Sequence, residues 1–493
     1  MGRLLRIVRT ITLLAVFAVI VVLAVLTFNT ERQGSRQLQV TALPKISIEP
    51  QAAAQRLAEA VRFRTISSYD DPEQNADAFA ALKAHIETSF PAFHAAAKQE
   101  VIAGHSLLYT WPGSDPALKP IALLAHQDVV PIAPGTEADW SEPPFAGHIK
   151  DGFIWGRGAW DDKGNLYAML EAADALAKAG LTPKRTIYFG FGHDEEVGGT
   201  RGAKAIAASL AARNVRLDFV LDEGLLISEG GIKGLAKPAA LIGVGEKGYA
   251  TLILTAKATP GHSSMPPHDT AIGMMSAALA KLEADKLPMR IDGVVGEMFA
   301  TLAPEMSGFN RVALSNLWLF KPLLLREFEK TGPTEAMVRT TTALTIFNAG
   351  DKDNVLPGVA SATVNFRLLP GDTQASVIDH VTRTIANDHV AIAPVASNTE
   401  PPPVTSIASA PYQLMSRTIR EIFPDAVVAP GLMIGGTDSR HYVGVADNLF
   451  RFSPLRATNE DLKRFHGTNE RLSVDGYADM IRFYRRLLEA SAS

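Results

Sequence analysis

Residues 121–128 read IALLAHQD, a short apolar run that ends in a histidine and an aspartate. Pro120 precedes the run and polar residues follow it, which predicts a buried strand. Because side chains alternate along a strand, His126 and Asp128 lie on the same side of its end. Asp128 could therefore accept the second ring N–H of His126 and fix its tautomer. Taken alone, the spacing is a weak signal, because a histidine near a strand end is more often a structural residue.

Two further apolar runs, at 185–191 and 217–221, predict strands that end near acidic residues. The first leads to Asp194-Glu195-Glu196 and the second to Asp222. Helical patterns separate the runs, at 164–179 and 203–210. Strands that alternate with helices predict an α/β fold, with a mostly parallel sheet and flanking helices. Ligands bind at the carboxyl ends of such strands, so these side chains could converge on one crevice.

Asp161, Asp162 and His466 could join the same group of side chains. Several carboxylates and two imidazoles at one point would repel one another or stay unpaired unless a cation lay between them. The simplest occupant is a pair of divalent metal ions. Of the neighbours Glu195 and Glu196, one could coordinate a metal while the other serves as a base. The alternative is a set of solvated acidic turns, which are common before a helix N-terminus.

The composition is ordinary for a globular protein, with 47% hydrophobic residues, 20% charged residues and a net charge of −4. Without a basic patch, the sequence does not predict a nucleic-acid-binding protein. There are no cysteines, which excludes disulfides, thiolate nucleophiles and cysteine-based zinc sites. Any metal must therefore be held by His, Asp and Glu. At 493 residues the chain is too long for one core and should form two or three domains.

The pattern changes after Gly245, where we expect a smaller α+β lid domain to be inserted. Its order of strand, helix, two strands, helix and strand predicts an antiparallel sheet with helices on one face. The strands are expected at 249–257, 344–347 and 362–368, and the helices at 270–282 and 374–386. We therefore expect the lid over 246–397 and the catalytic domain over 46–245 and 398–493.

The N-terminus carries an almost unbroken apolar run at 11–28, preceded by Arg3, Arg6 and Arg9. A membrane-spanning helix needs roughly 17–25 apolar residues, and its basic flank stays in the cytoplasm. We expect a single-pass anchor over 1–30, a polar tether over 31–45, and a folded part on the periplasmic or extracellular side. A cleaved signal peptide is the alternative.

Six motifs follow one another in an order that resembles the M20 metallopeptidases. They are AHQDVVP at 125–131, WGRGAWDDKG at 155–164, GHDEEVGG at 192–199, PGHSS at 260–264, NVLP at 354–357 and GGTDS at 435–439. Within that family, the apolar segment around 316–320 and 338–342 resembles the carboxypeptidase S branch. That branch includes secreted animal enzymes that make and hydrolyse N-fatty-acyl amino acids.

The resemblance implies a role for each site residue. His126 and Asp222 would hold one metal, Glu196 and His466 the other, and Asp161 would bridge both. Glu195 would be the general base, Asp128 would orient His126, and the Asp161–Asp162 peptide would be cis. His262 would stabilise the oxyanion, Arg367 would pair with the substrate carboxylate, and Gly435, Gly436 and Thr437 would line that pocket. Zinc is our first choice of metal, with cobalt or manganese as alternatives.

These roles predict hydrolysis of an amide bond next to a free carboxylate, in a small peptide or an N-acyl amino acid. A dipeptidase or aminoacylase of small polar substrates is an alternative within the same class. A membrane-tethered, non-catalytic metal-binding protein is a second, although a structural site would have no need of a free Glu195. The apolar segment could hold an acyl chain, form lid core, or form the interface of a homodimer through the lid.

Overall fold

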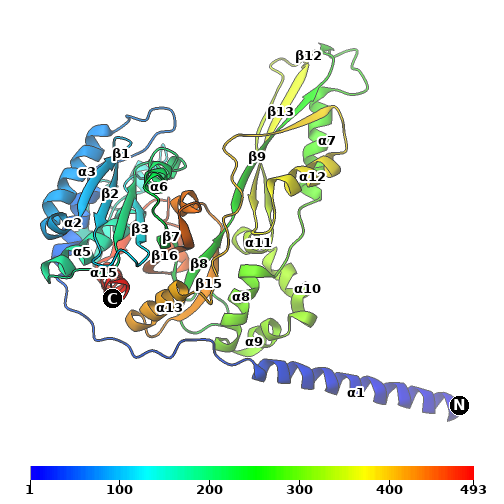
Figure 1. The fold of residues 1–493 in the computed structure, drawn as a ribbon. Coiled ribbons are helices and arrows are strands. Elements are labelled where there is room, and N and C mark those ends of the chain that lie inside the picture. Colours follow the sequence, from blue (N-terminus) through cyan, green and yellow to red (C-terminus); the bar gives the residue numbers. More distant parts are fainter. Residues whose placement is uncertain (1, 493) are drawn as a thin grey trace.

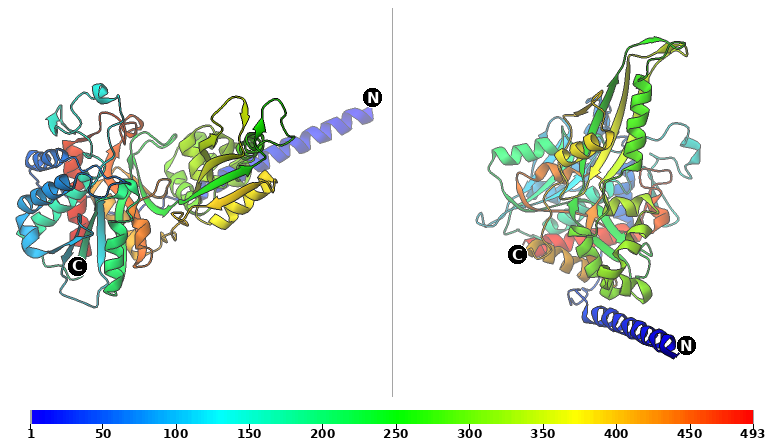
Figure 2. Two further views of the ribbon diagram at one scale, coloured as in Figure 1. Left: turned by 90° about the horizontal axis from the view of Figure 1, so that it is seen from above. Right: turned by 90° about the vertical axis from the view of Figure 1, so that its right-hand side faces the viewer.

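The computed structural model describes residues 2–492, which form a catalytic domain, an elongated lid and a projecting N-terminal helix. Figure 2 shows the lid standing beside the catalytic domain as a separate arm. The expected fold class is confirmed, because a large, mostly parallel sheet with flanking helices accompanies a separate antiparallel sheet.

The catalytic domain is built on an eight-stranded sheet in the order β1-β2-β6-β3-β7-β16-β8-β15. β3 pairs in parallel with β6 and β7, while β1 and β2 form an antiparallel edge. The strands span Lys98–Ile102 (β1), Ser106–Trp111 (β2), Ile121–His126 (β3), Ile187–Gly192 (β6), Leu217–Ser228 (β7), Ala239–Glu246 (β8), Val427–Met433 (β15) and Ala446–Ala457 (β16).

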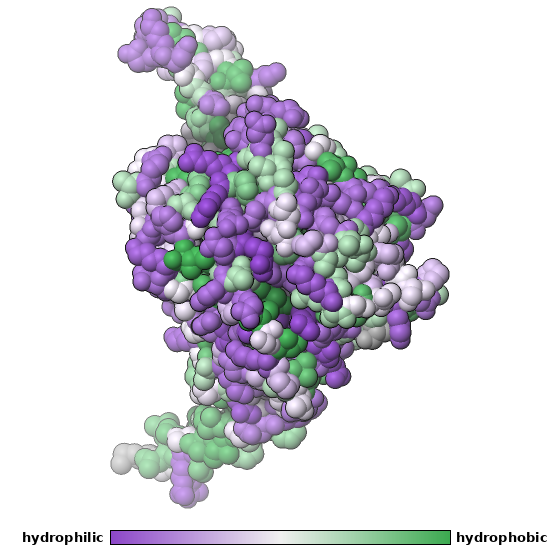
Figure 3. All heavy atoms as spheres, turned by 90° about the vertical axis from the view of Figure 1, so that its left-hand side faces the viewer, coloured by the Kyte–Doolittle hydropathy of each residue, from purple (hydrophilic) through white to green (hydrophobic). Residues whose placement is uncertain are grey.

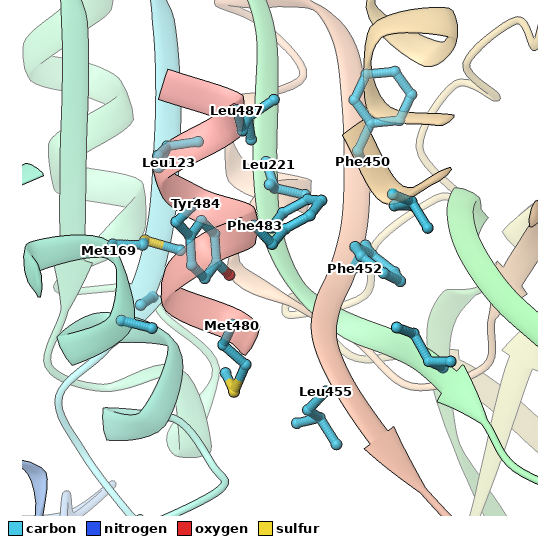
Figure 4. Packing of buried hydrophobic residues seen from close by; sticks show 14 of the residues in the cluster. Leu123, Met169, Leu221, Phe450, Phe452, Leu455, Met480, Phe483, Tyr484 and Leu487 are labelled. Atoms are coloured by element: carbon cyan, nitrogen blue, oxygen red, sulfur yellow. The ribbon is translucent and has the colours of Figure 1, made fainter. Parts of the chain in front are cut away.

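Helices cover both faces of this sheet, because neighbouring apolar residues of a central strand point to opposite sides. Leu123 belongs to the core on one face and Leu124 to the core on the other. In Figure 4, Phe483 of α15 lies beside Leu221 and Phe452 of the sheet. The catalytic-domain helices are Pro50–Val61 (α2), Ala76–Ser89 (α3), Pro91–Ala96 (α4), Lys163–Lys178 (α5), Ala203–Ala212 (α6), Ala410–Ile422 (α13), Asn459–Leu462 (α14) and Val474–Ser491 (α15). A small sheet joins His148–Lys150 (β4), Phe153–Trp155 (β5) and Arg471–Ser473 (β17).

The lid has its own four-stranded antiparallel sheet, in the order β11-β13-β9-β14. Its core lies between the sheet and two helices, α7 and α12. The bounds are Gly248–Lys257 (β9), Thr341–Ala349 (β11), Val359–Leu368 (β13), Val390–Pro394 (β14), Ala271–Ala284 (α7) and Gln374–Ile385 (α12). A two-stranded ribbon of Gly261–His262 (β10) and Val355–Leu356 (β12) forms the far tip of the lid (Figure 1).

The range that we expected for the lid contains four helices that pack instead on the catalytic domain. They are Gly293–Leu302 (α8), Gly308–Ser315 (α9), Leu317–Phe328 (α10) and Gly332–Val338 (α11). Val295, Met298 and Phe299 join the main catalytic core, and α8 lies against β15. Part of the apolar character of this segment therefore reflects packing on the edge of the large sheet, and the lid core contains none of the segment.

The N-terminal helix α1, Gly2–Arg32, projects from the catalytic domain next to α9 (Figure 1). It is the one helix of residues 2–492 that is long and apolar enough to cross a membrane. Figure 3 shows apolar side chains gathered on this projection, whereas the face of the catalytic domain in that view is mainly polar.

The segment after α1 is not the free tether that we expected. The Gln37 side chain donates to the carbonyl of Val428 at 2.9 Å and accepts its N–H at 2.7 Å. The Leu43 N–H donates to the carbonyl of Glu421 at 3.0 Å. Val428 lies in β15, the edge strand of the large sheet, so the Gln37 amide occupies backbone groups that such an edge leaves open.

Candidate metal centre and substrate site

Four of the five predicted metal ligands meet at the carboxyl ends of β3 and β6. His126 Nε2 lies 3.0 Å from Asp161 Oδ1, and His466 Nε2 lies 2.8 Å from Asp161 Oδ2. His466 Nε2 is also 3.3 Å from Glu196 Oε2. One ligand atom each from His126, Asp161 and Glu196 lie within 4.8 Å of one another. Asp161 thus has one oxygen toward each histidine, and the peptide bond that follows it is cis, as expected.

Asp222 lies within the neighbouring strand β7 and is buried. Its two carboxylate oxygens accept backbone N–H groups, from Glu223 at 3.0 Å and from Ser439 at 2.6 Å. The ring of His126 is among the charges that act on this carboxylate, but no direct hydrogen bond joins the two side chains within residues 2–492.

Asp128 holds several other groups in place in addition to His126. The closest acceptor for His126 Nδ1 is the backbone carbonyl of Asp128, at 3.0 Å, and the carboxylate Oδ1 follows at 3.4 Å. The same carboxylate accepts the backbone N–H groups of Glu195 and Glu196, both at 3.1 Å, and the hydroxyl of Ser67 at 2.6 Å. This one buried side chain therefore holds the histidine and the turn that carries the glutamates.

Glu195 is half-buried beside the cluster, and its carboxylate has no hydrogen-bond or ion-pair partner among residues 2–492. Desolvation, together with the nearby carboxylates of Asp438 and Glu196, raises its pKa well above the usual range. A side chain with this geometry is free to exchange a proton with a group in the crevice.

The cluster has more buried acid than its own cations balance. Burial raises the pKa of Glu196 to about 7 and that of Asp222 to about 6. Glu196 Oε1 is buried with no hydrogen-bond partner in the part of the chain described. An unpartnered buried carboxylate oxygen beside two imidazoles fits a divalent cation, and nitrogen and oxygen donors suit zinc.

Glu470, which sequence reasoning missed, fixes both loops that carry ligands. Its fully buried carboxylate accepts the backbone N–H groups of Gly158, Trp160 and Asp161 at 2.9, 3.0 and 3.2 Å. It also pairs with Arg157, which donates to the carbonyl of His466 at 3.1 Å. Nothing in the polar loop at 465–470 distinguished this glutamate from a solvated one.

The Gly435-Gly436-Thr437 loop and Arg367 form a second feature. A Cβ on Gly436 would lie 3.9 Å from Arg367 Nη1 and 2.3 Å from Arg440 Nη1, so both guanidinium groups face this loop. The Thr437 hydroxyl donates a hydrogen bond to the carboxylate of Glu246 at 3.0 Å. Sequence reasoning had not singled out Arg440, which donates to the carbonyl of Gly198 at 2.9 Å.

Arg367 has the chemistry of an anion site. Its guanidinium stacks on the ring of Tyr249 at 4.7 Å and has no carboxylate partner within residues 2–492. Burial lowers its pKa. A desolvated and unpaired guanidinium favours a bidentate carboxylate.

His262 is not brought to the cluster. It is exposed in β10, in the ribbon at the lid tip, and its Nδ1 lies 2.8 Å from the Ser264 hydroxyl. The lid would have to move, or a second copy of the chain would have to supply this residue, before it could reach a substrate at the metal cluster.

Comparison with known proteins agrees with this site. Residues 122–490 match the model of peptidase family M20/M25/M40. The chain is 42% identical to the probable carboxypeptidase S-like 2 of Dictyostelium discoideum, over 94% of this chain and 91% of the relative. It is also 42% identical to the N-fatty-acyl-amino acid synthase/hydrolase PM20D1 of Xenopus tropicalis, over 90% and 86%.

Among solved structures, the M20 family metallo-carboxypeptidase Sso-CP2 of Sulfolobus solfataricus shares the fold. Its TM-score is 0.64 at 19% identity, over 89% of this chain and 99% of the other. The fold and the histidine–carboxylate cluster are those of a metallopeptidase. The chain belongs to peptidase family M20.

Proposed function

We propose that this enzyme hydrolyses an amide bond next to a free carboxylate, as a carboxypeptidase or an N-acyl amino acid hydrolase. The observation that carries the proposal is the pairing of an unpartnered Glu195, beside a histidine–carboxylate cluster, with an unpaired Arg367 at the Gly-Gly-Thr loop. The first feature suits water activation, and the second suits recognition of a substrate carboxylate.

The residues fit two divalent ions, with zinc as the first choice. His126 and Asp222 would hold one, Glu196 and His466 the other, and Asp161 would bridge them, since its oxygens already face the two histidines. Such ions, when bound, lower the pKa of water and polarise the amide carbonyl.

Glu195 acts as the general base in this proposal. It takes a proton from the attacking water and returns it to the leaving amine, so that one carboxylate serves both halves of the reaction. Asp128 keeps Glu195 in place through the backbone N–H at 3.1 Å. The Arg367 guanidinium grips the substrate carboxylate, and Gly435, Gly436 and Thr437 line the wall beside it.

His262 would stabilise the oxyanion after lid closure or from a second copy of the chain. The second arrangement would make the enzyme a homodimer through the lid, which remains a proposal. A dipeptidase or aminoacylase acting on small polar substrates is the second candidate, because the helices at 293–338 pack on the catalytic core and so no longer indicate an acyl pocket in the lid.

The N-terminal helix is proposed to stay in the mature chain and to anchor it, with the catalytic domain on the non-cytoplasmic side. Arg3, Arg6 and Arg9 flank its cytoplasmic end. Leu26 and Thr30, near its other end, are buried against the folded domain, which favours retention over cleavage.

The test is a hydrolysis screen over dipeptides, short N-acyl and long N-acyl amino acids, combined with metal analysis. Glu195→Gln should retain metal and lose about 10²–10⁴-fold in kcat, the usual contribution of a general base. The matched control is Glu137→Gln, at an exposed glutamate. Each substrate is paired with its C-terminal amide, which should react far more slowly. Near-normal turnover by Glu195→Gln, or equal rates for acid and amide, would contradict the proposal.

A further inference from the structure

Helices α9 and α10 expose a set of large apolar side chains. Phe309, Trp318, Leu319 and Leu323 are 57%, 59%, 42% and 51% exposed. None of the twelve residues of α10 is fully buried, although its inner side packs partly on the main core through residues such as Leu324 and Phe328. Single exposed apolar residues are normal, but a cluster on one surface needs a partner.

This surface, defined by Phe309, Trp318, Leu319 and Leu323, begins where α1 joins the folded domain. The Asn316 amide donates to the carbonyl of Leu26 and to the hydroxyl of Thr30, both at 3.2 Å. Its side-chain oxygen accepts from Asn29 at 2.9 Å and from the Trp318 indole at 3.2 Å. Buried Asn316 therefore fixes the first turn of α10 at the level of α1 residues 26–30.

That level corresponds to the non-cytoplasmic surface of a membrane crossed by α1. The apolar run of α1 ends at Phe28, so residues 26–30 lie where the helix would leave the hydrocarbon. In Figure 1, α10 lies on the side of the molecule toward which α1 runs. The exposed surface thus begins next to the point where the apolar run of α1 ends.

We propose that the exposed apolar surface of α9 and α10 inserts into the outer leaflet of the membrane that α1 spans. Tryptophan is enriched at the membrane–water interface, where its ring is apolar and its N–H finds a polar partner. The exposed Lys321 and Arg326 of α10 can extend their charged ends toward the lipid headgroups. Interfacial helices bury their apolar side about 5–10 Å into this region.

This mode of attachment rests on the proposed anchoring role of α1 and does not depend on the reaction that the enzyme catalyses. A chain held by α1 alone could turn about its anchor. With a second contact through α10, and with Gln37 bound to the edge strand β15, the catalytic domain is held in one orientation on the membrane.

Trp318 is itself the reporter for the experiment. The other four tryptophans, Trp111, Trp140, Trp155 and Trp160, are at most 8% exposed, and α1 contains none. Full-length protein is reconstituted into phosphatidylcholine–phosphatidylglycerol vesicles, with or without phosphatidylcholine brominated near the headgroup end of its acyl chains. The emission of Trp318 is obtained by subtracting the fluorescence of the Trp318→Phe variant from that of the wild type. We expect the brominated lipid to quench most of this emission.

Two further variants complete the design. Trp318→Phe with Val101→Trp moves the reporter to β1, on the opposite side of the molecule in Figure 1, and its new tryptophan should not be quenched by the lipid. Leu319→Glu with Leu323→Glu should greatly reduce quenching of Trp318 while leaving the rate on a water-soluble substrate unchanged. A failure of the proposed function would be seen separately, because the wild-type enzyme would then not hydrolyse that substrate.

Iodide in the aqueous phase supplies the opposite test. Trp318 emission that resists brominated lipid but is quenched by iodide would place the surface in water and overturn the proposal. Emission that resists both quenchers would mean that another protein chain covers the surface, which would also overturn it. Quenching by brominated lipid and protection from iodide support it.

Discussion

The carboxylate of Glu470 accepts the backbone N–H of Asp161 at 3.2 Å, so a residue of the last loop holds the proposed bridging ligand. Through its ion pair with Arg157, the same carboxylate is connected to the carbonyl of His466. Two ligand-bearing loops that lie some 300 residues apart along the chain therefore depend on one buried side chain.

Glu470→Ala should destabilise the protein by about 3–5 kcal/mol, because it leaves the buried Arg157 and three N–H groups without their partner. Metal content should fall with it. Urea unfolding and metal analysis of the purified variant measure both effects. Glu460→Ala, at an exposed glutamate, should stay within about 0.5 kcal/mol of wild type. A Glu470 variant as stable and as metal-rich as wild type would contradict this role.

Gly467→Ala should weaken metal binding without removing a ligand. A Cβ at this position would lie 2.4 Å from the backbone carbonyl oxygen of Lys463, so the loop that carries His466 must shift. We expect a metal affinity about 10–100-fold lower, as when an outer-shell contact is lost. Competition with a zinc-binding dye measures it. Gly444→Ala, whose Cβ meets nothing within 4 Å, is the matched control and should bind as wild type does.

Gly436→Ala should raise KM for carboxylate substrates more than it lowers kcat. Its Cβ would lie 2.3 Å from Arg440 Nη1, so the guanidinium must move, which disturbs the hydrogen bond from Nη2 to the carbonyl of Gly198. Because Arg367 faces the same loop, the anion site should be distorted while the metal cluster is kept. Steady-state kinetics and metal content separate the two effects. Gly332→Ala, in open space, should change neither, and loss of metal from the Gly436 variant would argue against this assignment.

Without metal, the folded protein should become less stable as the pH rises. Burial raises the pKa of Glu196 to about 7, and hydrogen bonds that His466 donates to the carboxylates of Asp161 and Glu196 raise its own pKa to about 10. Both pKa values exceed those of the unfolded chain, which are about 4.5 for a glutamate and about 6.5 for a histidine, so the metal-free folded state binds more protons than the unfolded state. Its stability should therefore fall as pH rises from about 5 to about 8.

Zinc requires the deprotonated ligands, so its stabilising effect should grow over the same pH range. Thermal unfolding with chelator and with excess zinc, at several pH values, measures the gap between the two Tm values. A gap that stays constant with pH would show that these two side chains do not exchange protons for metal.

Sequence patterns predicted the parallel strands and their helices well, because each strand is a short apolar run and each helix has one apolar face. β3 and β6 end close to where the patterns ended, and the ligands follow from that placement. Four strands of the sheet, β1, β2, β8 and β16, were not predicted. β16 carries a fully buried Arg451 paired with Glu246, and a charge inside an apolar run hides a strand from pattern analysis.

The packing of α8–α11 and the docking of residues 33–43 could not be predicted for a different reason. Apolar periodicity indicates that a helix buries one face but does not say against what. Gln37 pairs with Val428 across nearly 400 residues, and a polar stretch gives no sign of such a contact. Glu470 shows the same limit, since its role exists only once Arg157 lies beside it.

The position of β16 in the large sheet also constrains how the chain is assembled. This strand lies between β7 and β8, yet it is made some 200 residues after them, when the whole lid has already been synthesised. Until then, β7 has a free edge and His466 has not yet been added to the growing chain. Folding of the catalytic domain must therefore be completed after synthesis of nearly the full polypeptide, and a chain truncated before Ala446 would lack this central strand and His466 together.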